Sequence, residues 1–526
     1  MPDDLTRLFP RTSKVRAALA PSLADLFFAV LLLALFARPQ SWQSLLGDGD
    51  TGWHIRTGEY ILQTGWVPFH DLFSFSRPNQ PWFAWEWLSD VTFALLHRWH
   101  GLAAIAGFCA MVIALAAAVL FWWLLRRGAG LWISLAVTLA AVSASTIHYL
   151  ARPHVFSLLF ATLALWILDE DRRRRTGWVW LLAPLSALWA NLHGGFAGWL
   201  AMLPVLVAAG ALERNWAVVR RHSAVAAGCF AATLLNPYGW RLHQHIVGYL
   251  GSSWIMESVQ EFQSPRIRSE NMQVFALLLL AGVALAAFSL AEVQPGARRQ
   301  WFEGALVLLW GFAALRSARH IPWFAVVVAP VLASQCARWW GARARRSPGG
   351  STAVLWELGQ ELGQSRRIGL WTPLLGGLAM AVALPAGGTA AFPASRFPVT
   401  AVERTASWLV PVGPAPRILT SDQWGDYLIF RLYPRQRVFF DGRSDFYGPG
   451  IGTDYQMLLS AGRGWREAMG RYRFDLALLP LDWPLGSILE REPGWSVVYR
   501  DRVSVLFARG GLKEAAGTVE CRAIAE

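Results

Sequence analysis

The sequence predicts an α-helical polytopic membrane protein with a small C-terminal α/β domain, and three observations lead to this fold class. First, the chain of 526 residues is 54% hydrophobic and only 16% charged, and its apolar residues come in long blocks. Second, the basic residues behind the net charge of +13 fall in short clusters between these blocks, as in membrane topology and not as on a nucleic-acid-binding face. Third, after about residue 391 short β-branched and aromatic runs alternate with Gly, Pro and Asp. No nucleic acid partner is therefore expected.

Eleven membrane-spanning helices are expected, because a bilayer core about 30 Å thick needs about 20 helical residues. The first span follows a polar and basic N-terminal segment, 1–22, that has no small-residue cleavage pattern, so this span is predicted to be retained. With the first outer loop at 39–101, the spans define a transmembrane domain over residues 23–390. They are expected at 23–38, 102–125, 130–148, 154–169, 177–192, 195–212, 223–236, 272–292, 302–317, 320–337 and 369–390.

The basic residues also predict the orientation of these spans. With the N-terminus in the cytoplasm, the inner segments hold twenty-one Lys and Arg residues, whereas the outer segments before the last span hold ten. This asymmetry follows the positive-inside rule and, with an odd number of spans, places the tail at 391–526 outside. The Arg-heavy, Ala-rich composition is typical of a bacterium with a GC-rich genome. We therefore expect a multi-pass protein of the bacterial inner membrane with a periplasmic or extracellular C-terminal domain.

Two further segments have informative patterns. The inner loop at 338–368 contains VLWELGQEL, which predicts a short amphipathic helix lying on the membrane surface. The tail is long enough to bury a modest core of its own, and runs typical of strands flank a helical stretch in it. Those runs lie in RILTSDQWGDYLIFRL, QRVFFDGRSDFYG, FDLALLPLD and WSVVYRDRVSVLFARG. The cysteines Cys109, Cys229, Cys336 and Cys521 are too scattered for a disulfide framework or a zinc site and are expected to be packing residues.

Polar residues collect at the outer ends of the predicted spans. A single His or Arg there is explained equally well by anchoring in the headgroup region, Trp residues by an aromatic belt, and Gly and Pro by tight turns. Five separate outer turns that combine such residues indicate a functional site, because ionisable groups at that depth are costly unless they face a cavity or a partner. The histidines at these outer ends include His54, His70, His148, His154, His193, His243 and His320.

The first outer loop carries the most specific pattern, GDGDTGWHIRTGEYIL. Asp48 and Asp50 lie in a Gly-rich segment whose backbone can bend to direct both carboxylates into one cavity. The residues that follow are expected to form a helix with His54 and Glu59 near its ends. One aspartate can act as a general base toward a hydroxyl, and the other can orient that base or hold a divalent cation. A turn or a helix N-cap would use the same residues, so the pattern alone leaves the structural and the catalytic interpretation open.

In this loop the chain resembles the GT-C superfamily of membrane glycosyltransferases. The loop opens with D-x-D-x-x-W-H-x-x-x-G-E and closes on an E-W-L segment; a basic N-terminus and one span precede it, and many spans and an outer C-terminal domain follow. The likeness covers the architecture of the whole chain, but at residue level mainly residues 22–90. The oligosaccharyltransferase motif W-W-D-Y-G is not found, and DQWGDY is only loosely similar to it, which disfavours peptide N-glycosylation.

The resemblance implies transfer of a sugar from a polyprenyl-phosphate carrier in the bilayer to a lipid, glycan or protein acceptor on the outer face. In the superfamily an acidic residue of the first outer loop is the general base or a metal ligand, which here points to Asp48 and Asp50 and to a divalent cation such as Mg²⁺ or Mn²⁺. Carboxylates beside the sugar and cations beside the departing phosphate match the charges that develop during such a transfer. By location and charge, the candidates for substrate binding are His54, Glu59, Arg152, His154, Asn191, His193, Asn236, Arg241, Arg319 and His320.

Two other functions stay open on the sequence alone. One is a transporter or flippase for a lipid-linked substrate, which is weakened because the polar groups gather at one face instead of along a path through the spans. The other is a noncatalytic scaffold that has kept a GT-C shell. The site hypothesis requires Asp48 and Asp50 to face a groove that Arg152, His193 and Arg319 also line.

Overall fold

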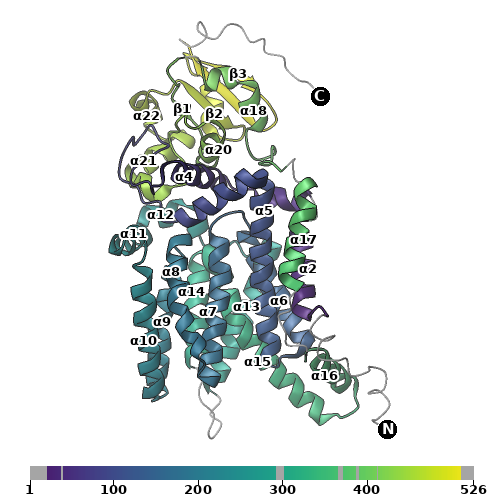
Figure 1. The fold of residues 1–526 in the computed structure, drawn as a ribbon. Helices are drawn as coiled ribbons and strands as arrows, with labels where there is room; N and C mark the ends of the chain where they lie inside the picture. Colours follow the sequence, from purple (N-terminus) through teal and green to yellow (C-terminus); the bar gives the residue numbers. More distant parts are fainter. Residues whose placement is uncertain are drawn as a thin grey trace.

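The computed structural model describes residues 20–36, 39–291, 301–364, 371–386, 390–411 and 413–510. In these residues a bundle of long helices carries a smaller domain with a β-sheet at one end (Figure 1). The described chain is mostly helical with several apolar helices and a small C-terminal sheet, which confirms the predicted fold class at this level. The basic N-terminal residues before Ala20 and the predicted packing residue Cys521 lie outside the described residues.

A helix occupies each of the eleven ranges predicted to span the membrane. Among the described helices four are long and apolar enough to cross a bilayer, and three more, Leu23–Phe36, Gly177–Leu192 and Phe196–Leu212, are apolar but shorter. The number of spans therefore stays a prediction. The helices in the eleven ranges are α2 (Leu23–Phe36), α5 (Trp87–Arg126), α6 (Gly130–Ser145), α7 (His154–Arg174), α8 (Leu182–Leu192) after η3 (Gly177–Leu181), α9 (Phe196–Leu212), α10 (Trp216–Thr233), α13 (Glu270–Ala291), α14 (Trp301–Arg316), α15 (Ile321–Arg346) and α17 (Trp371–Ala386).

Helix α5 is much longer than the predicted span at 102–125, because it contains two helical parts joined at a kink. At the kink His100 leaves the helical conformation, and Gly101 adopts a φ of 61°, which a glycine tolerates without the strain of a Cβ atom. The part before Gly101 belongs to the predicted outer loop, and the part after it is the apolar helix. The kink therefore separates a helix that borders the site from a helix of the bundle.

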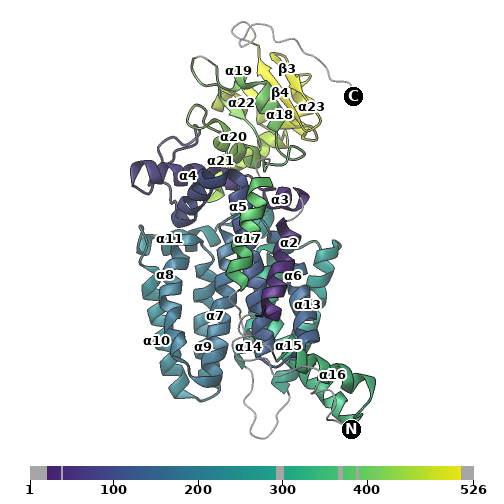
Figure 2. The ribbon, with the colours of Figure 1, turned by 45° about the vertical axis from the view of Figure 1, so that its right-hand side comes forward.

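The helix ends that the sequence places inside lie together at the end of the bundle opposite the C-terminal domain (Figures 1 and 2). Ion pairs join these ends. Arg126 of α5 lies 3.0 Å from Glu170 of α7. Arg172 of α7 lies 3.4 Å from Glu213, which follows α9, and 3.5 Å from Glu303 of α14. The spatial sorting of the ends agrees with the predicted sidedness, while the orientation in a membrane stays a prediction.

The predicted amphipathic segment of the inner loop forms α16 (Ser351–Leu362), which lies beside the end of α15 (Figure 2). A Cβ atom at Gly359 would lie 2.5 Å from the Trp132 ring, so this side of α16 packs closely against α6. Val354, Leu355 and Leu358 are exposed. Exposed apolar side chains are what a helix lying at a membrane surface presents to lipid.

Asp25, which lies within the range predicted for the first span, joins α2 to α17. Its carboxylate accepts hydrogen bonds from the backbone N–H and the hydroxyl of Thr372 at 2.8 and 2.5 Å. It also accepts from the N–H and hydroxyl of Ser22 at 2.8 and 2.7 Å. A fully buried carboxylate with this many donors is a structural cap between two helices.

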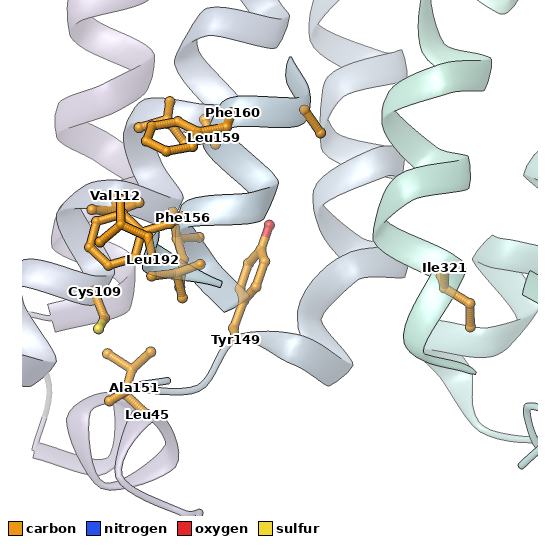
Figure 3. Close-up of a cluster of buried hydrophobic side chains, with 14 of the residues drawn as sticks. Leu45, Cys109, Val112, Tyr149, Ala151, Phe156, Leu159, Phe160, Leu192 and Ile321 are labelled. Carbon is orange, nitrogen blue, oxygen red and sulfur yellow. The ribbon is translucent and has the colours of Figure 1, made fainter. Parts of the chain in front are cut away.

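A cluster of buried hydrophobic side chains joins several helices of the bundle (Figure 3). Leu45 of α3 (Pro39–Leu45) and Ala151, which precedes α7, lie next to Cys109 of α5 in this core. The backbone N–H of Ala151 donates to the carbonyl of Leu45 at 2.7 Å. Cys109 and Cys229 are buried, as expected of packing residues, whereas Cys336 is exposed.

The C-terminal domain has a four-stranded sheet of order β1-β2-β4-β3. Strand β1 (Ile418–Leu419) pairs parallel to β2 (Leu476–Pro480), whereas β4 (Ser504–Arg509) pairs antiparallel to both β2 and β3 (Trp495–Arg500). Its helices are α18 (Val399–Arg404), α19 (Ala406–Leu409), α20 (Asp422–Leu432), α21 (Ser444–Leu459), α22 (Trp465–Tyr472) and α23 (Pro484–Leu489). The FDLALLPLD and WSVVYRDRVSVLFARG segments thus form strands, as predicted.

Two segments predicted to form strands contain little or no strand. In RILTSDQWGDYLIFRL only two residues are β-strand, and residues 422–432 form α20, because the Ser421 hydroxyl caps the helix by accepting the N–H of Trp424. Trp424, Tyr427 and Leu428 recur at helical spacing and are buried together. In QRVFFDGRSDFYG, Val438 makes one isolated bridge to Ser74 of the first outer loop. The buried Phe439 of this segment packs against Phe75 of the first outer loop and does not enter the sheet.

Candidate functional site

A cavity of about 800 Å³ lies between the outer end of the bundle and the C-terminal domain. Asp48, Asp50, Arg152, His193 and Arg319 all line it. The structure therefore brings together the five residues whose convergence the site hypothesis requires. One side of the cavity is formed by α4 (Asp50–Thr64), the loop before α5, and the turns around η2 (Thr146–His148) and η5 (Ala318–His320). The segment with α11 (Trp240–Leu250), α12 (Ser253–Ser258) and η4 (Gln260–Phe262) completes this side. The C-terminal domain forms the opposite wall.

Arg152 is the centre of the ionic contacts in this cavity. Its guanidinium lies 3.0 Å from an Asp48 oxygen and 2.6 Å from an Asp50 oxygen, and it also pairs with Glu261 of η4. Although burial favours the neutral acid, Arg152 and Arg319 together hold the pKa of Glu261 well below its usual range. One guanidinium thus compensates three carboxyl groups from different parts of the chain.

Asp50 faces a second carboxyl group from the C-terminal domain, Asp426 of α20. A Cβ atom at Gly442 would lie 2.1 Å from Asp50 Oδ1 and 2.9 Å from Asp426 Oδ2, so both oxygens converge above this glycine. Burial raises the pKa of Asp50 to about 7 against the opposing charge of Arg152. Burial and then the charge of Asp50 raise the pKa of Asp426 well above its usual value. Two buried carboxyl groups in contact cannot both ionise at low cost, so this pair shares a proton at neutral pH.

The glycines of GDGDTGWH allow α20 to approach this closely. A Cβ atom at Gly49 would lie 2.3 Å from the carbonyl oxygen of Gln423, and one at Gly52 would lie 2.7 Å from that of Asp426. The N–H of Gly49 also donates to the side-chain oxygen of Gln423 at 2.7 Å. The glycines of the motif therefore serve helix–helix contact, and its aspartates face the cavity.

Glu86, next to the start of α5, places another carboxyl group in the cavity wall. Its two oxygens lie 3.6 Å from Nε2 of His54 and 3.5 Å from Nε2 of His193. The other side of the His54 ring, Nδ1, lies 2.5 Å from Asp90 of α5. Burial raises the pKa of Glu86 to about 8, with Arg152 and Arg319 opposing. Burial, and next the charge of Arg152, lowers the pKa of His54 well below its usual value. Glu86 is thus mostly protonated at neutral pH beside a neutral His54.

Arg319 has fewer carboxylate contacts in the cavity than Arg152 has. Its guanidinium donates to the Tyr249 hydroxyl at 3.1 Å and lies 5.1 Å from the centre of the Phe262 ring. Its guanidinium lies 3.9 Å from the carboxylate of Glu261. Because Arg152 already binds three carboxyl groups, Arg319 retains more capacity to attract an anionic ligand.

A buried ion pair attaches the C-terminal domain to the first outer loop. Arg443, which is 3% exposed, lies 2.9 Å from Asp71 of that loop and 2.7 Å from Asp441. Its guanidinium lies 4.5 Å from the centre of the Trp82 ring. Asp422, Arg443, Asp445 and Tyr455 of the C-terminal domain also line the cavity. This domain is therefore a wall of the site and not only a distant cap.

The structure places five of the predicted substrate-binding residues elsewhere. Glu59 pairs with Arg56 at 2.6 Å on a part of α4 that does not line the cavity. The side-chain amide of Asn191 bonds to the indole of Trp87 and to the carbonyl of Leu235, and that of Asn236 bonds to the carbonyl of Thr233. Arg241 is exposed on α11, and His320 bonds to a carbonyl of α14. Their side chains face neighbouring helices or solvent instead of the cavity.

The remaining predicted residues line the cavity, and sequence reasoning missed several others. His54 and His154 line it, and His154 Nε2 donates to the carbonyl of His148 at 2.5 Å. Glu86 stands in the E-W-L segment, a signal that was available in the sequence. Glu261, by contrast, lies in a loop without any pattern that marks it.

The described residues fit a divalent cation poorly. They contain no group of three or more His, Cys, Asp or Glu side chains arranged to hold a metal ion. Arg152 already lies between Asp48 and Asp50, where a cation bound by both would have to sit. The oxygens of Asp50 and Asp426 that have no hydrogen-bond partner are buried, whereas Mg²⁺ usually keeps several waters beside one or two carboxylates. The donor set is better matched to a guanidinium and a shared proton.

Comparisons with known proteins show the fold. No protein-family model matches the chain, and no curated protein matches it. The solved structure of the arabinofuranosyltransferase AftD from Mycobacteria aligns with 94% of this chain at 14% sequence identity and a TM-score of 0.50. This chain covers 41% of AftD, less than half of its length. The structure of ArnT from Cupriavidus metallidurans in the apo state aligns over 93% of this chain and 98% of its own, at 15% identity and a TM-score of 0.48.

At the level of the fold the chain is therefore similar to AftD, a GT-C enzyme, in agreement with the resemblance that its first outer loop indicates. At this sequence identity the likeness concerns the fold alone, so the activity has to be argued from the cavity.

Proposed function

We propose that the protein is a membrane glycosyltransferase that moves a sugar from a polyprenyl-phosphate carrier to a hydroxyl group of an acceptor at the outer face of the membrane. The acceptor is a lipid, a glycan or a protein. The observation that supports this proposal is the convergence of carboxyl groups and cations in one cavity at the outer ends of the apolar helices. A lipid-linked donor cannot rise far above the bilayer, and a cavity at the ends of apolar helices suits such a donor.

In the proposed reaction Asp48 is the general base. It takes the proton of the acceptor hydroxyl while the acceptor oxygen bonds to the anomeric carbon of the sugar. The bond between this carbon and the phosphate oxygen breaks, and its electron pair leaves with the phosphate. Arg319 is the cation best placed to stabilise that departing charge, because Arg152 is occupied by carboxyl groups.

Access distinguishes the two aspartates of the motif. Asp50 binds Arg152 through Oδ2, and its Oδ1 is buried next to Asp426. Asp48 accepts the N–H of Asp50 at 3.0 Å and a bond from Arg152 at 3.0 Å, and each of its oxygens retains a lone pair. We therefore assign the base to Asp48 and the positioning of Arg152 to Asp50.

The test is sugar transfer in liposomes from a panel of radiolabelled polyprenyl-phosphate sugars. Asp48→Asn is expected to lower the rate at least about a hundredfold with folding intact, and Asp50→Asn to lower it less. Asp482→Asn, at an exposed carboxylate of the C-terminal domain, is the control and should leave the rate unchanged. If no donor in a broad panel is consumed, or if Asp48→Asn is fully active, the assignment is wrong, and a transporter or scaffold function is favoured instead.

A further inference from the structure

The two ring nitrogens of His193 have different partners, and these partners determine where its proton resides. Nδ1 accepts the backbone N–H of Gly195 at 2.9 Å and lies 2.6 Å from the hydroxyl oxygen of Ser157 on α7. That hydroxyl oxygen already accepts the indole N–H of Trp189 on α8 at 2.7 Å. Because an indole N–H can only donate, the Ser157 hydrogen is free to be donated to His193. Nδ1 thus accepts two hydrogen bonds, and the proton of the neutral ring lies on Nε2.

Close packing holds this arrangement in place. Trp189 is fully buried, and Ser157 is 3% exposed, so neither has water as an alternative partner. A Cβ atom at Gly195 would lie 2.2 Å from the Ser157 oxygen and 2.9 Å from His193 Nδ1. A glycine is therefore required where α9 begins, because any side chain there would separate the serine from the imidazole.

The Nε2–H group of His193 points to the cavity and to Glu86, 3.5 Å away. Burial, and next the charge of Arg319, lowers the pKa of His193 well below its usual value, so the ring stays neutral. Glu86 is mostly protonated below about pH 8 and is a donor as well. The charged and titratable groups that face His193 are Glu86, Arg152, His154, Glu261 and Arg319.

We propose that Ser157 and Trp189 are positioning residues that hold His193 as a neutral Nε2–H donor, and that this donor binds an anionic phosphate oxygen beside Glu86 and Arg319. The N–H of His193, the carboxylic O–H of Glu86 and the guanidinium of Arg319 each supply a donor to this corner, and phosphate oxygens only accept. This inference rests on the proposed function, in which the phosphate belongs to the lipid carrier, and it specifies how the phosphate is recognised. His193 acts as a hydrogen-bond donor there and not as a cation.

The test uses two replacements of His193 that keep different halves of the ring. In His193→Gln the amide N–H₂ reaches the place of Nε2, whereas in His193→Asn the shorter amide reaches only the place of Nδ1. Binding of polyprenyl phosphate to the purified full-length protein in nanodiscs is measured for both, with inorganic phosphate as a separate ligand. His193→Gln should bind polyprenyl phosphate within about threefold of the parent, and His193→Asn should bind at least about tenfold more weakly, as expected for loss of a hydrogen bond to a charged group.

Each outcome of this binding experiment decides the inference. If both variants lose affinity equally and parent binding strengthens as the pH falls below about 6.5, His193 acts as a cation and the inference is wrong. It is also wrong if both variants bind like the parent, or if the parent binds neither ligand. In a further outcome, the parent and His193→Gln bind inorganic phosphate, His193→Asn binds it more weakly, and none of them binds polyprenyl phosphate. His193 would then still be a donor to phosphate, but the ligand would be free phosphate and not the lipid carrier.

A second measurement needs neither ligand nor turnover. Nitrogen-15 NMR of histidine-labelled protein, with His193→Gln to assign the resonance, reports which nitrogen carries the proton. We expect Nε2–H in the parent and a smaller Nε2–H population in Ser157→Ala, and a parent ring protonated at Nδ1 would overturn the inference. Because binding and NMR do not require sugar transfer, they can succeed even if the proposed transferase activity is not found.

Discussion

Removal of the Arg152 guanidinium is the sharpest test of how the site is held together. In Arg152→Met the carboxyl groups of Asp48, Asp50 and Glu261 lose their shared partner in a mostly buried place. Removing one member of a buried ion pair typically costs about 3–5 kcal/mol, because the charge that remains is neither solvated nor paired. We expect a loss of stability of about this size at neutral pH and above.

The pH dependence of this loss separates an electrostatic effect from lost packing. Without Arg152 the pKa of Asp50, which burial already raises to about 7, should rise further, and the pKa of Glu261 should no longer be held low by this guanidinium. A carboxyl group whose pKa is raised in the folded state contributes stability below its unfolded pKa, and that stability is lost as the pH rises through the folded pKa. The ion pair of Glu261 is lost at both pH values, whereas the additional deficit from Asp50 should be small near about pH 5 and full near about pH 8, so the total deficit of Arg152→Met should be larger near about pH 8.

The assay is thermal unfolding of the purified protein in detergent at both pH values. Because unfolding of membrane proteins is commonly irreversible, apparent melting temperatures are compared at one fixed scan rate. The double variant Arg152→Met with Asp50→Asn should recover part of the stability at about pH 8, because it removes one unpaired charge. A deficit that is equal at both pH values, or no recovery in the double variant, would refute the electrostatic account.

Three further predictions concern other parts of the site. Gly49→Val should lower stability by about 1–3 kcal/mol and reduce sugar transfer, because a side chain there collides with α20; thermal unfolding and the transfer assay measure both effects. Sugar transfer should fall as the pH decreases through about 7, where Asp50 takes up a proton and releases Arg152, and a pH–rate profile of Asp50→Asn should lack this acidic limb. Arg443→Met should cost about 3–5 kcal/mol by leaving Asp71 and Asp441 unpaired, and limited proteolysis should then cleave the junction with the C-terminal domain faster.

Much of the bundle was predictable from the sequence, because apolar runs of sufficient length have few stable alternatives in a bilayer. Helices occur in all eleven predicted ranges, and the amphipathic inner segment is helical as expected. The C-terminal domain was harder to predict. Its β-branched and aromatic runs at DQWGDYLIFRL indicated a strand, but a serine cap and burial at helical spacing produce α20 instead. Local propensity is weak where an element is buried on several sides.

The candidate site was also predictable only in part. The sequence placed Asp48, Asp50, Arg152, His193 and Arg319 at one height, and the structure shows them around one cavity. Residues at the same height, such as Glu59 and His320, face other neighbours. A hydropathy pattern determines how deep a residue lies in a bilayer, but it contains little information about the direction in which that residue faces in a bundle of many helices.

The sequence by itself determined the fold class of the protein and the approximate position of its helices. It also determined which end of the bundle carries the polar groups and which acidic motif faces the cavity. Only the tertiary structure decided that Asp50 meets Asp426, that Glu86 lies between two imidazoles and that Ser157 determines the proton position on His193. The physical reason is sequence separation. Burial of apolar surface is a property of each segment, whereas hydrogen bonds and ion pairs between segments hundreds of residues apart depend on how the helices pack.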